Sequence, residues 1–491
     1  MADVLVVGAG PTGLALAIQL TRYGVPVRII DLLAEPMRES RAVGIQGRSL
    51  ALFERMEVAA PFLECGVRYR EVFVHSDRRP MVRKQVELLA LPQSETENIL
   101  GERLRALGKQ VDRGVRLVHL EQDVTKVRVH LRSAEGESDA EYAYVIGCDG
   151  ANSAVRFLLD AQFAGEADSE AYALADVAID ADFPRDAVSL HLTGGNLVAL
   201  FPLPNDLVRV IVERDGGFEN LPTLDDFRSA LYLSGIQARS YGEPLWISQL
   251  SATQRRVTVS SHGRVFLAGD AAHTFSPVGA QGLNTGLQDA ENLAWKLALT
   301  YRFGALETVL ASYTTERDAV AARLMRKIRS VQDRIAAIDE AAVNYERSPI
   351  VRRPGHTPDP APGARAPDGP LVRLSDGGET NVFALFAQLK HALVIFTYRR
   401  DQFVHETLLE MQRHAEIADV YIVTRDASVG GAHFLDANGA VFRAFGAEGE
   451  PQYVLIRPDG YVAARGALRD YRAVLAYLAA TFGVRQPQQS T

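Results

Sequence analysis

Cysteine is scarce in this chain, and only Cys65 and Cys148 occur among its 491 residues. Two cysteines so far apart provide neither a disulfide framework nor a cysteine zinc site. The eleven histidines show no HExxH or other paired spacing, so we expect no metal site. A GxSxG elbow is missing as well, which argues against a serine hydrolase.

Long apolar runs and an excess of basic residues are also missing. No apolar stretch reaches the roughly 18 residues that a membrane span requires, and the start MADVLVVG lacks the features of a signal peptide. The formal net charge is −8, whereas a nucleic-acid partner favours clustered Lys and Arg. Together with the low cysteine content, these absences predict a soluble cytoplasmic protein without a membrane or nucleic-acid partner.

The first 31 residues predict a βαβ unit with a glycine-rich turn. Two β-type runs, residues 3–7 and 27–31, flank a helical pattern at residues 12–23. The turn GAGPTG before the helix is a GxGxxG sequence, and an aspartate ends the second strand. Such glycines let backbone amides approach a pyrophosphate, and the acid can hold ribose hydroxyls. The motif alone fits NAD or FAD, through Gly8, Gly10, Thr12, Gly13 and Asp31.

A second informative segment is GDAAHTFSPVGAQGLN, residues 269–284. The buried strand pattern before it delivers Asp270 at a strand's carboxyl end, where α/β folds place ligands. Pro277 stiffens the following turn, and Gly282 helps backbone amides approach a flat ligand at the start of the next helix. His273 has no visible partner and is interpreted as a packing residue, so the catalytic residues stay unknown.

The remaining patterns predict the domain organisation. Strands between the two motifs indicate an antiparallel substrate domain at residues 165–261, inserted into a cofactor domain made of residues 1–164 and 262–345. Whether part of residues 70–92 joins the substrate domain is left open. At about 150 residues per domain, the length allows two or three domains.

A Pro- and Gly-rich linker is expected at residues 346–369. The βαβ, ββ, α order of residues 370–491 is typical of a thioredoxin-like α/β domain. No cysteine follows its first strand, so dithiol chemistry is excluded and a packing or oligomer role is favoured.

A third motif, VIGCDGANSAVR at residues 145–156, makes the pattern specific. GxGxxG, DGxxSxVR and GDAAHxxxPxxxxGLN in this order resemble the FAD-dependent group A aromatic hydroxylases, the p-hydroxybenzoate hydroxylase-like family, over about residues 1–345. The added C-terminal domain with IRPDGYVAARG resembles the subgroup of phenol, aromatic-polyketide and rifampicin monooxygenases. The resemblance implies a Rossmann-like FAD domain of the GR2 type.

The resemblance also implies a set of residues that hold FAD non-covalently. Asp149 would support both FAD and a visiting nicotinamide cofactor, although helix capping alone is an open alternative. The remaining assignments are Gly8, Gly10, Thr12, Gly13 and Asp31 at the adenosine diphosphate half, Arg41 near the cofactor, Gln93 at the flavin, Val124 beside the adenine, Asp270 at the ribityl chain, and Leu283 and Asn284 at the isoalloxazine.

The implied reaction is the hydroxylation of an aromatic substrate, such as a multi-ring polyketide or a phenol. NADPH, or NADH, reduces the flavin, dioxygen adds at flavin C4a, and the hydroperoxide transfers one oxygen atom. The substrate is expected between the antiparallel sheet and the flavin, beside Phe201, Pro202 and Trp246, for which a sheet-core role is the alternative.

Other activities on the same scaffold stay open. A Baeyer-Villiger or epoxidising oxygenase is the first alternative, and a non-catalytic flavin-binding interaction protein is a more remote one. A flavin-dependent halogenase is disfavoured because Trp246 and Trp295 are the only tryptophans, so its tryptophan-pair motif is missing. The sequence does not decide whether the chain forms a homodimer.

Overall fold

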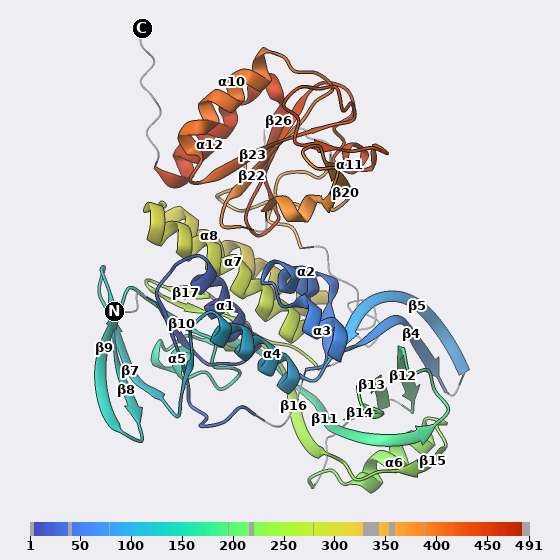
Figure 1. Cartoon of the computed structure of the whole chain (residues 1–491). Helices are drawn as coiled ribbons and strands as arrows, with labels where there is room; N and C mark the ends of the chain where they lie inside the picture. Colours follow the sequence, from blue (N-terminus) through green and yellow to red (C-terminus); the bar gives the residue numbers. More distant parts are fainter. Residues whose placement is uncertain are drawn as a thin grey trace. The chain divides into compact units, whose positions relative to one another are not determined.

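The computed structural model describes most of the chain (Figure 1). The described residues are 4–37, 42–77, 79–194, 196–215, 220–277, 279–327, 343–352, 359–386 and 388–483. They divide into two compact units, each described here by itself: the first comprises Met1–Arg22, Pro26–Glu291 and Asp318–Ala341, and the second Tyr23–Val25, Asn292–Arg317 and Ala342–Thr491.

A six-stranded sheet forms the centre of the first unit. Its order is β17-β18-β10-β1-β2-β6, and all neighbours are parallel except the β17–β18 pair. The apolar run of β1 is buried along its whole length, as expected of a parallel strand covered on both faces. The strands are β1 (Val4–Val7), β2 (Val27–Asp31), β6 (Val111–Arg113), β10 (Tyr144–Gly147), β17 (Ser261–His262) and β18 (Val265–Leu267).

The helices of this unit connect and cover its sheets. α1 follows β1 and packs against α4, and it has the helical apolar spacing predicted for residues 12–23. A three-stranded antiparallel sheet, β7-β8-β9, completes this part. The bounds are α1 (Pro11–Arg22), α2 (Gly47–Arg55), α3 (Ala59–Cys65), α4 (Gln93–Ala106), α5 (Ala154–Leu158), β7 (Arg116–Gln122), β8 (Val127–Ser133) and β9 (Gly136–Tyr142).

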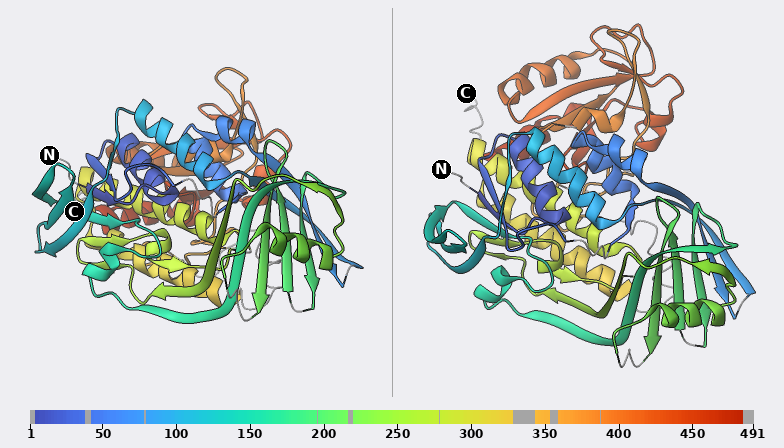
Figure 2. Two further views of the ribbon diagram at one scale, coloured as in Figure 1. Left: turned by 90° about the horizontal axis from the view of Figure 1, so that it is seen from below. Right: turned by 60° about the horizontal axis from the view of Figure 1, so that its bottom comes forward.

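A ten-stranded sheet forms the other part of the first unit. Its order is β19-β16-β11-β14-β13-β12-β4-β5-β3, with β15 also paired to β11. α6 lies across one of its faces (Figure 2). The bounds are β3 (Gly44–Gln46), β4 (Val67–Ser76), β5 (Arg79–Ala90), β11 (Phe163–Ala181), β12 (Ala187–Thr193), β13 (Asn196–Pro202), β14 (Leu207–Asp215), α6 (Leu224–Leu233), β15 (Ala238–Tyr241), β16 (Trp246–Val257) and β19 (His273–Thr274).

The second unit contains a seven-stranded sheet of order β21-β20-β24-β23-β22-β25-β26. Its central strand β22 is parallel to β23 and antiparallel to β25. The bounds are β20 (Pro370–Arg373), β21 (Glu379–Asn381), β22 (His391–Phe396), α10 (Gln402–Met411), β23 (Ala418–Thr424), β24 (Phe434–Leu435), α11 (Ala440–Ala444), β25 (Gln452–Ile456), β26 (Val462–Ala467) and α12 (Arg472–Phe482).

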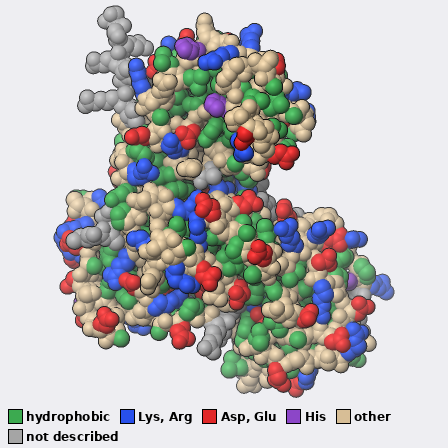
Figure 3. All heavy atoms as spheres, viewed as in Figure 1, with side chains coloured by type: hydrophobic (Ala, Val, Ile, Leu, Met, Phe, Trp, Pro, Cys, Tyr) green, Lys and Arg blue, Asp and Glu red, His purple; other side chains and the backbone are tan. Residues whose placement is uncertain are grey.

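Two long helices, α7 (Gln281–Phe303) and α8 (Glu307–Lys327), each contribute residues to both units. The helical pattern of residues 316–338 predicts a long helix there; α8 contains its first part, up to residue 327, and the rest falls outside the described residues. On the face drawn in Figure 3, acidic and basic side chains are intermingled. Among the described residues, no helix is long and apolar enough to cross a membrane.

Candidate functional site

The GxGxxG turn between β1 and α1 is packed so closely that two of its glycines cannot carry a side chain. Gly8 has a φ of 102°, and a Cβ atom there would lie 2.4 Å from the Cys148 carbonyl oxygen. A Cβ atom on Gly13 would lie 1.9 Å from the carbonyl oxygen of Gly8. At Gly10 the nearest atom to a Cβ position is Oε1 of Glu97, 4.0 Å away, which leaves room for a ligand to approach the backbone.

Asp31, at the end of β2, is fixed beside this turn. Its Oδ2 accepts a hydrogen bond from the Ala9 amide at 2.7 Å, and its Oδ1 accepts one from the Leu33 amide at 2.8 Å. The guanidinium of Arg113 lies 3.7 Å from Oδ1. The structure therefore joins the predicted turn and the predicted acid, and it adds Arg113, which the sequence reasoning missed.

Gln93 begins α4 and reaches the same region through Glu97. Its Nε2 donates to Glu97 Oε1 at 2.9 Å, and its Oε1 accepts from the Ala42 amide at 3.3 Å. Burial is the main cause that raises the pKa of Glu97. Glu97 was missed, although its position four residues after Gln93, on the same helix face, was a usable signal.

Val124 and Arg41, which were also predicted for the cofactor site, have a different outcome. Val124 is 88% exposed in the turn between β7 and β8, where its carbonyl oxygen accepts hydrogen bonds from Arg264 at 2.9 and 2.7 Å. It thus lies in a turn of the three-stranded sheet, whereas Asp31 ends β2 of the six-stranded sheet. Arg41 lies outside the described residues.

The GDAAH segment packs directly against the glycine turn. Cβ atoms on Gly269 and Gly286 would lie 2.6 and 2.3 Å from Thr12 Oγ1, so the threonine fills the space that both glycines leave. Asp270 is exposed after β18, and its Oδ1 is 3.7 Å from the Cβ position of Gly282 in the first turn of α7. The predicted acid and the predicted helix start are therefore adjacent.

Asn284 fixes the start of α7 through its side chain. Its Oδ1 accepts from the Gln46 amide at 2.9 Å and from Ser49 Oγ at 2.7 Å, and its Nδ2 donates to the Gly44 carbonyl at 2.8 Å. The side chain is thus committed to β3 and α2, which leaves the backbone of this turn for a ligand. The neighbouring Leu283 and Pro277 are half-buried.

His273 is buried behind this segment and forms a hydrogen bond with Asp289 of α7. The distance from its Nε2 to Asp289 Oδ2 is 2.7 Å, and the same oxygen accepts from the Gly269 amide at 2.9 Å. This cluster connects the turn that carries Asp270 to the body of α7. The arrangement agrees with a packing role for the histidine.

Asp149 accepts hydrogen bonds at the start of α5, whose N-cap residue is Ser153, and it lies against the glycine turn. Its Oδ2 accepts from the Val155 amide at 3.1 Å, its Oδ1 accepts from Ser153, and burial raises its pKa. Its Cα is 2.7 Å from the Cβ position of Gly8. Arg156 of α5 donates to the Ala271 carbonyl at 3.0 Å. All three sequence motifs thus converge, and the cofactor role of Asp149 stays a prediction beside the hydrogen bonds that are present at the start of α5.

A row of side chains crosses four neighbouring strands of the ten-stranded sheet. In the strand register, Trp246 of β16 pairs with Asp176 of β11, Asp176 with Arg209 of β14, and Arg209 with Phe201 of β13. Arg209 donates to both carboxylate oxygens of Asp176 at 2.7 Å, and the Trp246 indole donates to Asp176 Oδ2 at 3.1 Å. The Arg209 guanidinium carbon lies 5.0 Å from the centre of the Trp246 ring.

Phe201 and Trp246 thus belong to one row across the same sheet, and Pro202 follows Phe201 in β13. Phe201 is only 4% exposed, within an apolar cluster against which the half-buried Trp246 packs. Tyr69 of that cluster donates to the Pro202 carbonyl. Asp176, Arg209 and Tyr69 were missed by the sequence reasoning, because an isolated charge within an apolar strand pattern does not reveal its partner.

The face that carries this row is the one that contacts the cofactor motifs. Ser276, a few residues after Asp270, donates to the Tyr172 hydroxyl at 3.1 Å, and Arg209 donates to the Ala42 carbonyl at 3.0 Å. The apolar cluster packed under α6 belongs to the opposite face. The structure thus brings an aromatic, partly polar sheet face beside the loop that precedes α7.

A parallel sheet with converging glycine turns, next to an antiparallel sheet with an aromatic face, defines a dinucleotide-binding flavoprotein fold. Comparison with known proteins agrees, because residues 1–328 match a family model described as FAD binding domain. The chain belongs to this family of FAD-dependent monooxygenases and hydroxylases. The open backbone at Gly10, the fixed Asp31 and the exposed Asp270 fit an extended FAD molecule.

Three similar proteins illustrate the relationship. The 6-methylpretetramide 4-monooxygenase of Streptomyces rimosus is 32% identical over 94% of this chain and 90% of its own length. The pentachlorophenol 4-monooxygenase of Sphingobium chlorophenolicum is 31% identical over 95% of this chain and 94% of its own. The solved structure of the OxyS anhydrotetracycline hydroxylase from Streptomyces rimosus is 28% identical, covers 99% of both chains and has a TM-score of 0.75.

The contacts of the glycine turn predict the effect of a single methyl group. Gly13→Ala should lower the free energy of unfolding by at least about 2 kcal/mol and weaken FAD binding, because the new Cβ overlaps the Gly8 carbonyl. Gly101→Ala is the matched control, since this glycine is also helical but has no atom within 4 Å of its Cβ position. We expect the control to gain up to about 1 kcal/mol. Thermal unfolding and FAD fluorescence titration measure both effects, and equal behaviour of the two variants would contradict the packing argument.

Asp318 of α8 gives a prediction about pH. Its Oδ2 accepts from the Ser260 amide at 3.2 Å, and burial raises its pKa to about 6. The folded state therefore holds this proton more tightly than the unfolded state, whose carboxyl has a pKa of about 3.9, so the group increasingly destabilises the fold from about pH 4 to pH 6. Asp318→Asn keeps an acceptor and should raise the unfolding free energy by about 3 kcal/mol at pH 8 and by roughly half as much at pH 5. Denaturant unfolding at both pH values tests this, and an equal gain at the two values would refute it.

Proposed function

We propose that this protein is an NAD(P)H-consuming monooxygenase that hydroxylates an aromatic small molecule, a multi-ring polyketide or a phenol. The observation that carries the proposal is the contact between the aromatic sheet face and the loop before α7, made by Ser276 and Tyr172. An aromatic substrate on that face would lie next to a cofactor held at Asp270. The names of the similar monooxygenases, which refer to a polyketide-type compound and to a chlorinated phenol, support this substrate class.

Bound FAD would supply the redox chemistry, accepting two electrons from NAD(P)H and activating dioxygen, so that one oxygen atom enters the substrate and the other leaves as water. NADPH is the preferred donor. The protein's part is to bind, orient and keep the site dry. Gly8, Gly10, Thr12, Gly13 and Asp31 would hold the adenosine diphosphate half of the cofactor, Asp270 its ribityl chain, and the backbone at Leu283 and Asn284 its ring system.

In the substrate region, Asp176 is proposed to orient aromatic side chains and not to act as a base. Its two oxygens already accept three N–H donors from Arg209 and Trp246. A carboxylate held by these donors fixes both side chains relative to the sheet. It would hold the indole of Trp246 in one orientation, so that the ring forms a fixed wall for a planar substrate.

We also infer that the C-terminal sheet is a thioredoxin-like domain. The order β22, α10, β23, β25, β26 and α12 supports this, as does the arrangement of parallel β22 and β23 beside antiparallel β25 and β26. The turn between β22 and α10 contains Thr397 and Asp401 and no cysteine, and Asp401 caps the helix through the amides of Phe403 and Val404. A structural role fits this domain better than dithiol chemistry.

The proposed activity can be tested directly on the purified holoprotein. Pentachlorophenol, tetracyclic phenols and quinones would each be added with NADPH or NADH, and nicotinamide oxidation, hydrogen peroxide release and product mass would be measured. We expect one substrate class to stimulate oxidation and to gain one oxygen atom as a ring hydroxyl. Stimulated oxidation that yields only hydrogen peroxide would overturn the hydroxylase assignment. A product with an inserted ring oxygen or an epoxide, identified by NMR, would favour the other oxygenase chemistry.

The contacts of Asp176 with Arg209 and Trp246, called the polar row below, predict a specific role for Trp246. Trp246→Ala should raise KM for the aromatic substrate about tenfold and increase the fraction of NAD(P)H oxidised without product, because the wall of the site is lost and water enters. Tyr232→Ala is the control, since Tyr232 is an exposed aromatic residue on α6, which packs on the opposite face of the sheet. Steady-state kinetics with peroxide detection measures both. Unchanged KM and coupling in the Trp246 variant would remove it from the proposed site.

A further inference from the structure

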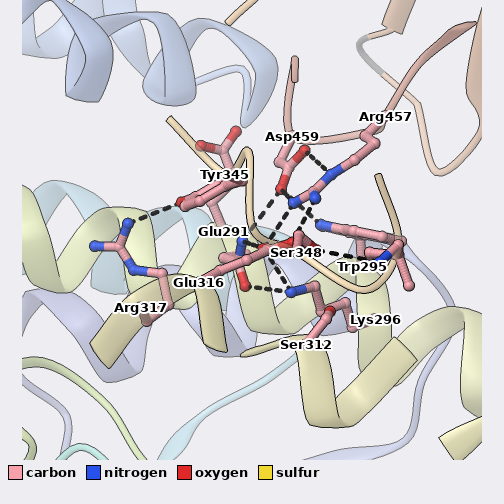
Figure 4. Close-up of polar contacts among 12 residues, drawn as sticks. Glu291, Trp295, Lys296, Ser312, Glu316, Arg317, Tyr345, Ser348, Arg457 and Asp459 are labelled. Atoms are coloured by element: carbon pink, nitrogen blue, oxygen red, sulfur yellow. Dashed lines mark hydrogen bonds and ion pairs between the residues drawn. The ribbon is translucent and has the colours of Figure 1, made fainter. Parts of the chain in front are cut away.

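Four charged side chains form a buried cluster in the second unit, and the proposed reaction does not use it (Figure 4). Lys296 comes from α7, Glu316 from α8, and Arg457 and Asp459 from the turn between β25 and β26. Arg457 donates to both Glu316 oxygens at 2.6 and 2.9 Å, and Lys296 Nζ lies 2.8 Å from Glu316 Oε2. The side chains of Lys296, Glu316 and Arg457 are 0% exposed.

Neutral groups complete this cluster. The Trp295 indole donates to Asp459 Oδ2 at 3.0 Å, Asn292 donates to Glu316 Oε2 at 2.7 Å, and Ser348 donates to Glu316 Oε1. Arg457 also donates from Nε to Asp459 Oδ1 at 2.9 Å. Two cations therefore face two carboxylates, and the described contacts use the acceptor oxygens of both acids.

The pKa values of Lys296 and Glu316 depend on the balance between the two cations and the two carboxylates. Burial lowers the pKa of Lys296 to about 8, so Lys296 needs its anionic neighbour to remain charged. Arg457 and Lys296 hold the pKa of Glu316 below its usual range against the opposing effect of burial. Removing one partner of such a buried pair is strongly destabilising, because the other charge stays buried without compensation.

The cluster therefore allows only one axial position and one rotation of helix α7 against the C-terminal sheet. A helix displaced by one residue moves about 1.5 Å along its axis and turns by about 100°, which would separate Asn292, Trp295 and Lys296 from their partners. Apolar packing tolerates such shifts better than buried charges do, and register specification is the best attested use of buried polar groups.

α7 is one continuous helix, and its other end carries the contacts of Asn284 with β3 and α2. Asn284 and Lys296 are separated by twelve positions, or about 18 Å of helix. We propose that the C-terminal sheet, through Arg457, fixes the axial position of α7 and so places the first turn of this helix for FAD. Arg457 is thus a positioning residue, and only the final step, from helix position to cofactor, rests on the proposed function.

Arg457→Met and Arg465→Met form a matched pair for the test. Both arginines are 0% exposed, Arg457 in the turn before β26 and Arg465 within β26, but the described hydrogen bonds of Arg465 are with Pro360, Phe445 and Gln452, none of which belongs to α7. Both variants should lose thermal stability. We expect Arg457→Met to bind FAD at least tenfold more weakly and to lose amide hydrogen-exchange protection in residues 281–287, whereas Arg465→Met keeps both. Equal FAD affinity and equal protection of α7 in the two variants would overturn the proposal.

A double variant keeps the test decisive if Arg457→Met does not fold. Arg457→Met with Asp459→Asn removes one cation and one anion, so Lys296 and Glu316 remain a balanced pair. Its stability should recover, while FAD affinity and protection of residues 281–287 stay low because the sheet no longer anchors the helices. Wild-type FAD affinity in this variant would refute the anchoring role. Failure of the hydroxylase proposal is distinguishable, since it would show as wild-type protein that binds FAD but oxidises no aromatic compound.

Discussion

Close contact between backbone turns is the constraint on which the candidate cofactor site depends. The turn after β1 touches the turn after β10 at Gly8 and Cys148, and it touches the turn after β18 where Thr12 meets Gly269. These distances are short enough that a side chain on either glycine would force the strands apart. The six-stranded sheet therefore presents the ends of several strands as one continuous surface of backbone amides and carboxylates, a suitable surface for a long, phosphate-bearing cofactor.

The two parts of the first unit contribute in different ways. The part built on the parallel sheet provides backbone groups, and the side chains of Asn284 and Asp289 in its helix α7 are occupied in fixing turns and helices. The antiparallel sheet provides side chains, in which one ion pair, Asp176 with Arg209, aligns the aromatic Trp246. This division is consistent with a family in which one cofactor site serves many substrates, because the sheet face can change without disturbing the backbone turns.

The fold near the glycine turns was predictable from the sequence because its signals are local. Strand, turn, helix and acid follow one another within 31 residues, and residue spacing alone indicates each of them. The partnerships of Asp176 with Arg209 and of Glu316 with Arg457 join residues that are 33 and 141 positions apart. A single sequence contains no signal that pairs two distant charges, so the polar row could not be predicted. The expected ββ order of the C-terminal domain is present as the antiparallel β25–β26 pair around Arg457, but the buried ionic contacts of this turn were not expected.

The division of α7 between the two compact units limits how the C-terminal sheet could be exchanged between related proteins by recombination. A recombination point placed just before residue 370 would separate the C-terminal sheet from residues 292–317, which belong to the same compact unit. The incoming sheet would then meet helices whose lysine and glutamate were matched to a different arginine. A viable chimera would need to carry the second half of α7 and the first half of α8 along with the sheet. The compact unit is therefore discontinuous in the sequence, although the sheet itself is formed by C-terminal residues alone.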